Sequence, residues 1–567
     1  MGNTQTFTEE KSDVAADERG GIAHRSLHEH TERLAPQIYE VTPEVWCVVG
    51  NGLSNQTFIK GPEGIIAIDT GESIEEMNSA VDQLRTVSKE PVVAVVYTHF
   101  HYVNGTAALM EKEPIEAIWG HERISHNLER SATEIAPTYT RGLIEQFGIQ
   151  MPENGPDAVV NVGLGLAYRL AHHAPSTPGY IPADHIFSGD CSVEIAGLEM
   201  IVTEAPSDAD DSVTLYFPAL QVAVQNLVWP ALFNVFAIRG EEYRDPRSLI
   251  KGIDHLRTLN VQHLVATHGP PLSGAEEIQQ RVTAYRDSIQ FLWDQTVRWT
   301  NRGATGAELA HKIQLPALYD NDWLTKQHYG LAEHHVRQIR SGLFGFFDGD
   351  PVALLPLDTA EEAERMVNAI GGPERVRNMC SEALEGSTND LRWAISLAGR
   401  LVRCQEATET DRELLARALR TAAQHTTSSN IRNWCITRAL QLEGDIDEVR
   451  LNTHRFSRRQ VERWPTDKAV SILRVLIDPD QLDGIDFHLI FELDDERTGL
   501  HFRNHVACPT DGRGGDAVLS GSRTTWDQIL TGSANLQSAI SSGDMVLEGD
   551  LIAATSALQS IDHPGFQ

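Results

Sequence analysis

The sequence predicts an α/β sandwich in its first part, followed by a bundle of helices and a smaller α+β unit. Short apolar runs surround one helical stretch over residues 38–106. Helix-period patterns dominate 359–442, and strand-like runs return after 485. A chain of 567 residues is too long for one core. We therefore expect a flexible segment over 1–35 and domains over 36–345, 346–450 and 451–567.

The first domain is expected to present polar residues at the ends of buried strands. Its β-branched and apolar runs are bounded by turn residues, as strands are. Predicted strands lie at Val45–Val49, Thr57–Lys60, Ile65–Asp69, Val92–Val96, Met200–Thr203, Val213–Phe217, Leu220–Val224 and His263–Ala266, and predicted helices at about Ile74–Val87 and Pro246–Leu259. This order fits a sandwich with ligands on loops at the strand ends.

A histidine pair follows the apolar run Val92–Val96. His99 and His101 are separated by one residue, in a turn that Gly105 closes. Both imidazoles can then aim at one point, which suits a metal ion because neutral imidazole is a common ligand. A pair of solvated loop histidines is the alternative on these residues alone. A later strand delivers His268 to a Gly/Pro turn in the same way.

The rest of the chain predicts helices and then a separate unit. Ala and Leu recur at helical spacing in hairpins, and such a bundle suits dimerisation or packing. The predicted helices include Glu361–Ile370, Asp390–Val402, Asp411–His425 and Asn430–Leu442, and the strands of the last unit are Ile485–Leu493, Gly499–Ala507 and Ala517–Ser520.

Composition limits the partners. The formal net charge is -33, from 80 acidic and 47 basic residues, which argues against nucleic acid or an anionic membrane as the main partner. Six scattered cysteines without a CxxC motif indicate reduced thiols. No signal peptide and no apolar run of membrane-spanning length is visible. We expect a cytoplasmic protein with a small-molecule substrate.

Residues up to about 345 resemble the alkylsulfatases of the metallo-β-lactamase superfamily. The resemblance is carried by Gly50–Asn55, Ile68–Gly71, Tyr97–His101, Thr203–Pro206, Gln225-Asn226, Ile238–Gly240, Arg244-Asp245 and Thr267-His268. The middle part resembles the helical dimerisation domain of that family, and the tail resembles its sterol-carrier-protein-like domain. The resemblance implies a metallo-β-lactamase αββα sandwich, a dimerisation domain and a C-terminal α+β domain, in a homodimer.

The resemblance also implies a metal centre. The family's HxHxDH motif feeds two zinc ions, and His99, His101 and Glu204 match the ligands of the first, whereas His268 matches the last histidine of the second. Two histidines, one carboxylate and water form a catalytic zinc set. The same set is the facial triad of non-haem iron enzymes. We expect zinc, with iron as the alternative.

The chain departs from the family pattern at the second zinc. Val103 stands where the family has Asp, Asn104 where it has His, and Gln225 where a bridging Glu is expected. Valine cannot coordinate a metal, and amide oxygens are weak donors for a transition metal. We therefore expect one zinc ion rather than two, with Asn104 and Gln225 as candidate ligands.

An anion-binding set is the other part of the resemblance. Asn234, Arg239 and Arg244 match positions that resemble the family's sulfate-binding residues. The guanidinium fork suits a tetrahedral oxyanion. Structural salt bridges with Asp245 or Glu241 are the alternative use of the two arginines.

The favoured function is a metal-dependent hydrolase that cleaves an alkyl ester with an anionic head group through a metal-bound water. In it, Arg239 and Arg244 would hold the anion, the tail domain would shelter an apolar chain, and Tyr102 could hydrogen-bond the substrate. His268 could act as a base or as a fourth ligand. Two alternatives are open: a mononuclear zinc or non-haem iron enzyme with different, redox or biosynthetic, chemistry, and a non-catalytic protein that binds an amphiphile.

Overall fold

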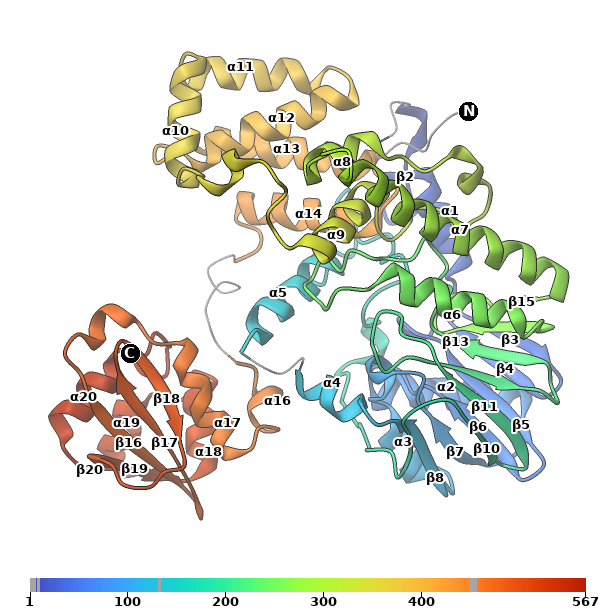
Figure 1. Cartoon of the computed structure of the whole chain (residues 1–567), viewed down its shortest axis with the longest axis horizontal. Helices are drawn as coiled ribbons and strands as arrows, with labels where there is room; N and C mark the ends of the chain where they lie inside the picture. Colours follow the sequence, from blue (N-terminus) through green and yellow to red (C-terminus); the bar gives the residue numbers. More distant parts are fainter. Residues whose placement is uncertain (1–6, 8–10, 131–133, 448–455) are drawn as a thin grey trace. The chain divides into compact units, whose positions relative to one another are not determined.

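The computed structural model describes residues 7, 11–130, 134–447 and 456–567 (Figure 1). The chain divides into two compact units. The first comprises 1–128 and 142–446, and the second comprises 129–141 and 447–567. The predicted boundary at 450/451 lies outside the described residues.

Two sheets form the centre of the first unit. The seven-stranded sheet has the order β3-β4-β5-β6-β7-β8-β9, antiparallel up to β6 and parallel from β6 onward. The six-stranded sheet has the order β10-β11-β12-β13-β14-β15, with β13 and β14 parallel. The strands are β3 (Gln37–Thr42), β4 (Val45–Val49), β5 (Gln56–Gly61), β6 (Gly64–Ile68), β7 (Val92–Val96), β8 (Ala117–His121), β9 (His185–Phe187), β10 (Cys191–Ile195), β11 (Leu198–Glu204), β12 (Val213–Phe217), β13 (Val222–Gln225), β14 (His263–Ala266) and β15 (Leu272–Ser273).

The sheets pack face to face because successive side chains of a strand point to opposite faces. In β4, Val45, Cys47 and Val49 enter the core between the sheets, together with residues of β11–β14. Trp46 and Val48 of the same strand pack on the other face, against helix α2. The outer face of the second sheet packs on α6 and α7. This is the predicted αββα sandwich.

Helices cover the sandwich and continue into the helical part (Figure 1). Helix α2 begins at Ser73, whose hydroxyl accepts the Glu76 N–H at 3.1 Å, and Asp245 caps α6 in the same manner. The helices from 74 to 344 are α2 (Ile74–Val87), α3 (Thr106–Lys112), α4 (Ile124–Arg130), α5 (Ala136–Gln146), α6 (Pro246–Thr258), α7 (Ala275–Thr300), α8 (Gly306–Lys312) and α9 (Ala332–Phe344).

Residues 11–35 carry secondary structure, in the region where the sequence predicts a flexible segment over 1–35; residues 1–6 and 8–10 of that segment lie outside the described residues. Strands β1 (Val14–Ala16) and β2 (Ile22–His24) pair, and helix α1 (Arg25–Arg33) follows. Leu27 is buried, and the buried His30 contacts the Gly163 carbonyl at 2.7 Å. The sequence did not predict this helix because its residues are mostly polar, so that few apolar residues mark the face that packs on the unit.

The helical part and the second unit follow the predicted order. Five helices share an apolar core: α10 (Thr359–Ile370), α11 (Pro373–Leu384), α12 (Thr388–Arg403), α13 (Glu409–His425) and α14 (Ser429–Glu443). The second unit holds a sheet of order β18-β17-β16-β19-β20. Its elements are α16 (Arg458–Val461), α17 (Thr466–Ser471), β16 (Phe487–Leu493), β17 (Glu496–Arg503), β18 (Val506–Thr510), β19 (Ala517–Gly521), α18 (Arg523–Leu530), α19 (Leu536–Ser542), β20 (Met545–Gly549) and α20 (Leu551–Gln559). Within the described residues, no helix has both the length and the apolar character that crossing a membrane requires.

Candidate metal centre

The histidine pair lies where β7 passes into a short 3-10 turn, Phe100–Tyr102. The Thr70 N–H donates to the Tyr102 carbonyl at 2.8 Å, which ties this turn to the end of β6. Gly105 closes it, and a Cβ there would lie 2.0 Å from the Thr70 carbonyl oxygen. Only glycine fits such a close approach of two backbone segments.

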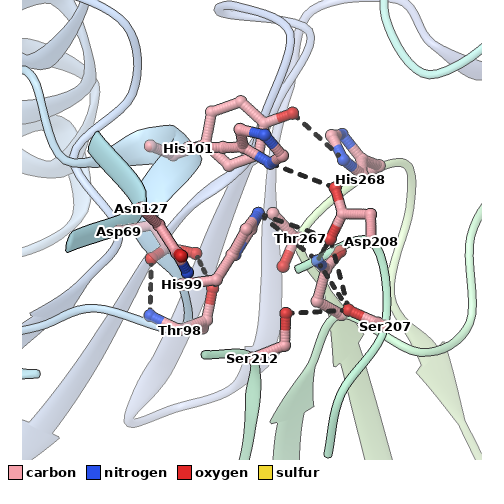
Figure 2. Close-up of polar contacts among 12 residues, drawn as sticks. Asp69, Thr98, His99, His101, Asn127, Ser207, Asp208, Ser212, Thr267 and His268 are labelled. Atoms are coloured by element: carbon pink, nitrogen blue, oxygen red, sulfur yellow. Dashed lines mark hydrogen bonds and ion pairs between the residues drawn. The ribbon is translucent and has the colours of Figure 1, made fainter. Parts of the chain in front are cut away.

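His99, His101 and Asp208 point toward one another (Figure 2). One ligand atom from each lies within 4.8 Å of the other two. His101 Nδ1 is 3.1 Å from Asp208 Oδ2, and His99 Nε2 is 3.9 Å from Asp208 Oδ1. Two imidazole nitrogens and a carboxylate oxygen form a donor set that fits a divalent metal ion.

The carboxylate of this cluster is Asp208, whereas the sequence had indicated Glu204. Glu204 still belongs to β11, where it pairs with Val213. Its side chain is 37% exposed and accepts a hydrogen bond from His121 Nε2 at 3.0 Å. Asp208 lies in the loop between β11 and β12, which lets its side chain turn toward the histidines. The sequence alone does not show which carboxylate of the acidic segment between these two strands turns inward.

A chain of hydrogen bonds orients His99. Asp69 accepts the Thr98 N–H at 2.8 Å and the Thr98 hydroxyl at 2.6 Å. The Thr98 oxygen is 2.8 Å from His99 Nδ1 and can accept its proton, because the hydroxyl proton is directed at Asp69. His99 Nε2 is then left with its lone pair facing the cluster, as a metal ligand requires.

Asn226 is a residue of the centre to which sequence reasoning assigned no role. Its Nδ2 donates to Asp208 Oδ1 at 2.6 Å and lies 3.3 Å from His99 Nε2. The Trp229 indole N–H donates to Asn226 Oδ1 at 2.9 Å. Since an indole nitrogen only donates, this bond fixes which end of the amide faces the cluster.

The charges around the cluster favour the binding of a cation. Burial lowers the pKa of His99 to about 3. Burial also acts to lower the pKa of His101, but the carboxylates of Asp208 and Glu241 outweigh it and raise that pKa to about 9. Burial would raise the pKa of Asp208, yet His99 and His101 hold it well below its ordinary value. A metal ion can therefore replace the proton on His101.

Two of the positions at which the chain departs from the two-zinc pattern, Val103 and Gln225, are directed away from the cluster. Val103 is fully buried and packs in the apolar core under the first sheet. Gln225 Oε1 accepts the backbone N–H groups of Leu227 and Val228, so its side chain closes the following loop. The backbone N–H of Asn104 donates to the Gly71 carbonyl at 3.0 Å.

His268 and Tyr102 form a buried pair beside the cluster. His268 Nδ1 donates to the Leu53 carbonyl at 2.9 Å, which leaves Nε2 as the acceptor. The Tyr102 hydroxyl lies 3.3 Å from this Nε2. Figure 2 shows His268 beside the three candidate ligands, and its unprotonated nitrogen is directed at the Tyr102 hydroxyl.

The predicted anion-binding arginines both face Glu241. Glu241 Oε1 accepts from Arg239 Nε at 3.1 Å and from Arg239 Nη2 at 2.6 Å, and Arg244 Nη2 lies 3.8 Å from Oε2. Arg244 also donates to the Asn234 backbone carbonyl at 2.8 Å. The Asn234 side chain is buried, and neither of its amide atoms has a hydrogen-bond partner among the described residues. Asp245 instead pairs with Arg247.

Two helix-covered sheets with a His-His-Asp group at the strand ends form an arrangement that fits a metal-dependent enzyme. Family profiles described as "Alkyl sulfatase dimerisation" and "SCP-2 sterol transfer family" match residues 305–445 and 472–560.

Similar proteins match over most of the chain. A linear primary-alkylsulfatase of Pseudomonas sp. is 31% identical over 526 residues, covering 89% of this chain and 98% of the relative. An (R)-specific secondary-alkylsulfatase of Pseudomonas sp. is 28% identical, covering 90% of this chain and 79% of the relative. The structure of the stereoselective inverting sec-alkylsulfatase Pisa1 from Pseudomonas sp. matches with a TM-score of 0.81 at 24% identity, over 98% of this chain and 89% of that one. The chain belongs to the alkylsulfatase family.

Proposed function

We propose that the chain hydrolyses alkyl sulfate esters at a metal centre built on His99, His101 and Asp208. The observation that supports this most is the buried His-His-Asp group, in a chain of the alkylsulfatase family. When bound there, a divalent metal supplies Lewis-acid chemistry and activates water. Zinc is the ion we propose, and iron is the alternative that the same donor set allows.

One metal ion, rather than two, is the stoichiometry we propose. At the second position, Val103 lies in the core and Gln225 is bonded to the backbone of its own loop. His268 Nε2 is directed at the Tyr102 hydroxyl. In place of a second metal, the Tyr102–His268 pair would hydrogen-bond an ester oxygen and hold a proton beside it. Proton transfer of this kind requires hydrogen-bond reach between the groups, which the 3.3 Å separation of the Tyr102 hydroxyl and His268 Nε2 provides within the pair.

The anionic head group would lie on the side of the cluster that carries Arg239, Arg244 and Asn234. Both guanidinium groups are buried, where charge-assisted hydrogen bonds to an oxyanion are strong. The unpartnered Asn234 amide in the same region can donate to a further oxygen of the head group.

The alkyl chain would lie in a cleft of about 1270 Å³ in the first unit. Apolar side chains line much of it, among them Phe147, Met151, Val159, Leu166 and Leu170. Tyr168 and Arg169 also line this cleft, and both contact the Glu72 carboxylate, at 3.4 and 3.7 Å. We propose that the alkyl chain extends from this cleft past Glu72, whose charge interacts with that of His101, toward the cluster. The SCP-2-like unit is a second place for an amphiphile.

A homodimer is the assembly we propose. An exposed apolar segment, residues 343–357, joins α9 to α10 inside the region that matches the dimerisation profile. Phe346 is 86% and Leu355 85% exposed, although both are large apolar residues. Contiguous exposed apolar surface of this kind marks interaction sites. The six free cysteines agree with a reducing compartment, and we propose the cytoplasm.

The test is sulfate release from dodecyl sulfate by the purified chain loaded with zinc, iron or manganese in turn. We expect release with zinc, and its loss in the His99→Ala and Asp208→Ala variants. Absence of sulfate release with every metal, from a folded and metal-loaded chain, would refute the function. Elemental analysis of the same samples gives the metal content per chain and separates one ion from two.

A further inference from the structure

The Glu241 side chain occupies the position where a bound anion would meet the two arginines. It is only 4% exposed, in the loop between β13 and α6. One carboxylate oxygen, Oε1, takes two donors from Arg239, at 3.1 and 2.6 Å. The other oxygen, Oε2, is 3.8 Å from Arg244 Nη2. An Arg–carboxylate pair of this kind is the arrangement by which a protein binds an external carboxylate.

Glu241 also extends toward the metal centre. Its Oε1 is 3.6 Å from His101 Nε2, the ring nitrogen opposite the one that faces Asp208. The carboxylate therefore lies between the arginines and a candidate metal ligand. A substrate whose head group is to reach both the arginines and the metal must pass through the space that Glu241 fills.

We propose that Glu241 is an internal counter-ion that an anionic head group must displace from Arg239 and Arg244, and that it thereby makes the site reject carboxylate amphiphiles. The selectivity follows from the number of oxygens. A fatty carboxylate offers the same two oxygens as Glu241 and must also leave water, so it gains little by exchange. A sulfate ester has three free oxygens, which can meet both guanidinium groups and still leave one for the metal.

This inference rests on the proposed function only for the identity of the substrate. The displacement itself is a matter of binding, and it can be measured without turnover. Glu241→Gln keeps the size of the side chain and removes its charge, whereas Glu241→Ala empties the space. Glu242→Gln is the matched control, because it removes one negative charge from the neighbouring exposed residue.

The experiment is calorimetric titration of the zinc-loaded full chain with decanoate and with inorganic sulfate. We expect Glu241→Gln to bind decanoate about tenfold or more tightly than the unmodified chain. In this variant no carboxylate of the protein competes with decanoate for Arg239 and Arg244. The gain for sulfate should be at least as large, because the same displacement is relieved and sulfate carries two charges, and Glu242→Gln should change neither value. Glu241→Ala should show the same order of gains.

Two results would overturn the inference. One is unchanged or weaker decanoate binding by both Glu241 variants at full zinc content. The other is loss of zinc from both variants without any gain in anion affinity, which would make Glu241 only a support for His101. If the variants gain affinity but no form of the chain releases sulfate from dodecyl sulfate, the inference stands and the proposed function fails.

Discussion

The Trp229 indole N–H donates to Asn226 Oδ1 at 2.9 Å, and through this bond it sets which atom Asn226 presents to the metal centre. The amide nitrogen faces Asp208 Oδ1 at 2.6 Å and His99 Nε2 at 3.3 Å. Asn226 is therefore a donor that holds Asp208 in place rather than a metal ligand. Partners of this outer-shell kind orient the ligands and tune metal affinity.

We expect Asn226→Ala to weaken zinc binding by about 10–100-fold, as loss of an outer-shell partner does. Trp229→Phe should reproduce part of this loss, because the amide can then rotate and turn its oxygen to Asp208. Competition with a chelator measures both affinities. Trp526→Phe is the matched control, since Trp526 is equally buried and donates to the Ala469 carbonyl in the second unit. A Trp229→Phe chain with unaltered zinc affinity would contradict the role of the indole.

Substitutions of Asp208 and Glu204 are expected to have opposite effects on zinc binding. Asp208→Asn should reduce zinc affinity more than the about 10–100-fold that an outer-shell change costs, because a ligand itself is lost. Glu204→Gln should leave zinc content and affinity unchanged, since that carboxylate faces His121 and solvent. Elemental analysis after dialysis checks both variants. Loss of zinc from Glu204→Gln, with retention by Asp208→Asn, would return the site to the assignment made from sequence.

The fold could be predicted because its signals are local. The apolar run Val45–Val49 and the helical spacing in Ile74–Val87 each indicate which side chains are buried, and the structure confirms both elements. Polar segments gave weaker signals. Helix α1 was missed because Leu27 is the only apolar residue in Arg25–Arg33, so no helical spacing of apolar residues is visible.

The centre was less predictable because it depends on long-range contacts. His99 and His101 stood out through their spacing, whereas Asp208 is one of four acidic residues in the run EAPSDADD. Only the return of the β11–β12 loop to the β7 turn distinguishes it. Asn226 lies 127 residues from His99 in sequence, so no local pattern could connect them. The sequence left open whether Arg239 and Arg244 bind an anion or form structural salt bridges. In the structure, both arginines face Glu241.

Zinc affinity should rise with pH. Asp208 and Glu241 raise the pKa of His101 to about 9, so its ring carries a proton at neutral pH and must release it when the metal binds. We expect the affinity to increase by about tenfold per pH unit between about 7 and 9 and to level off above. Chelator competition across this range measures the slope. A flat profile between pH 7 and 9 would show that His101 is already neutral.

The raised pKa of His101 also predicts that the stability of the metal-free chain depends on pH. The folded pKa of His101 lies above the ordinary value of 6.5. Its contribution to the free energy of unfolding is therefore fully present below about pH 6.5 and is lost as the pH rises through about 9. Urea unfolding of the metal-free chain at pH 6.5 and 9.5 should show lower stability at the higher pH. The difference should shrink in His101→Gln, and an equal difference in that variant would assign the effect to other groups.

The apolar segment at residues 343–357 predicts where two copies meet. Replacing Phe346 and Leu355 together by serine should convert the proposed dimer to monomer at micromolar concentration. Burial of each large apolar side chain contributes about 1.5–3 kcal/mol, so their joint loss weakens association by about 100-fold or more. Light scattering after gel filtration measures the mass. Ile186→Ser is the control, because Ile186 is an exposed apolar residue on β9, outside that segment. A double variant that remains dimeric would place the contact elsewhere, whereas a control that dissociates would show that the effect is not specific to this segment.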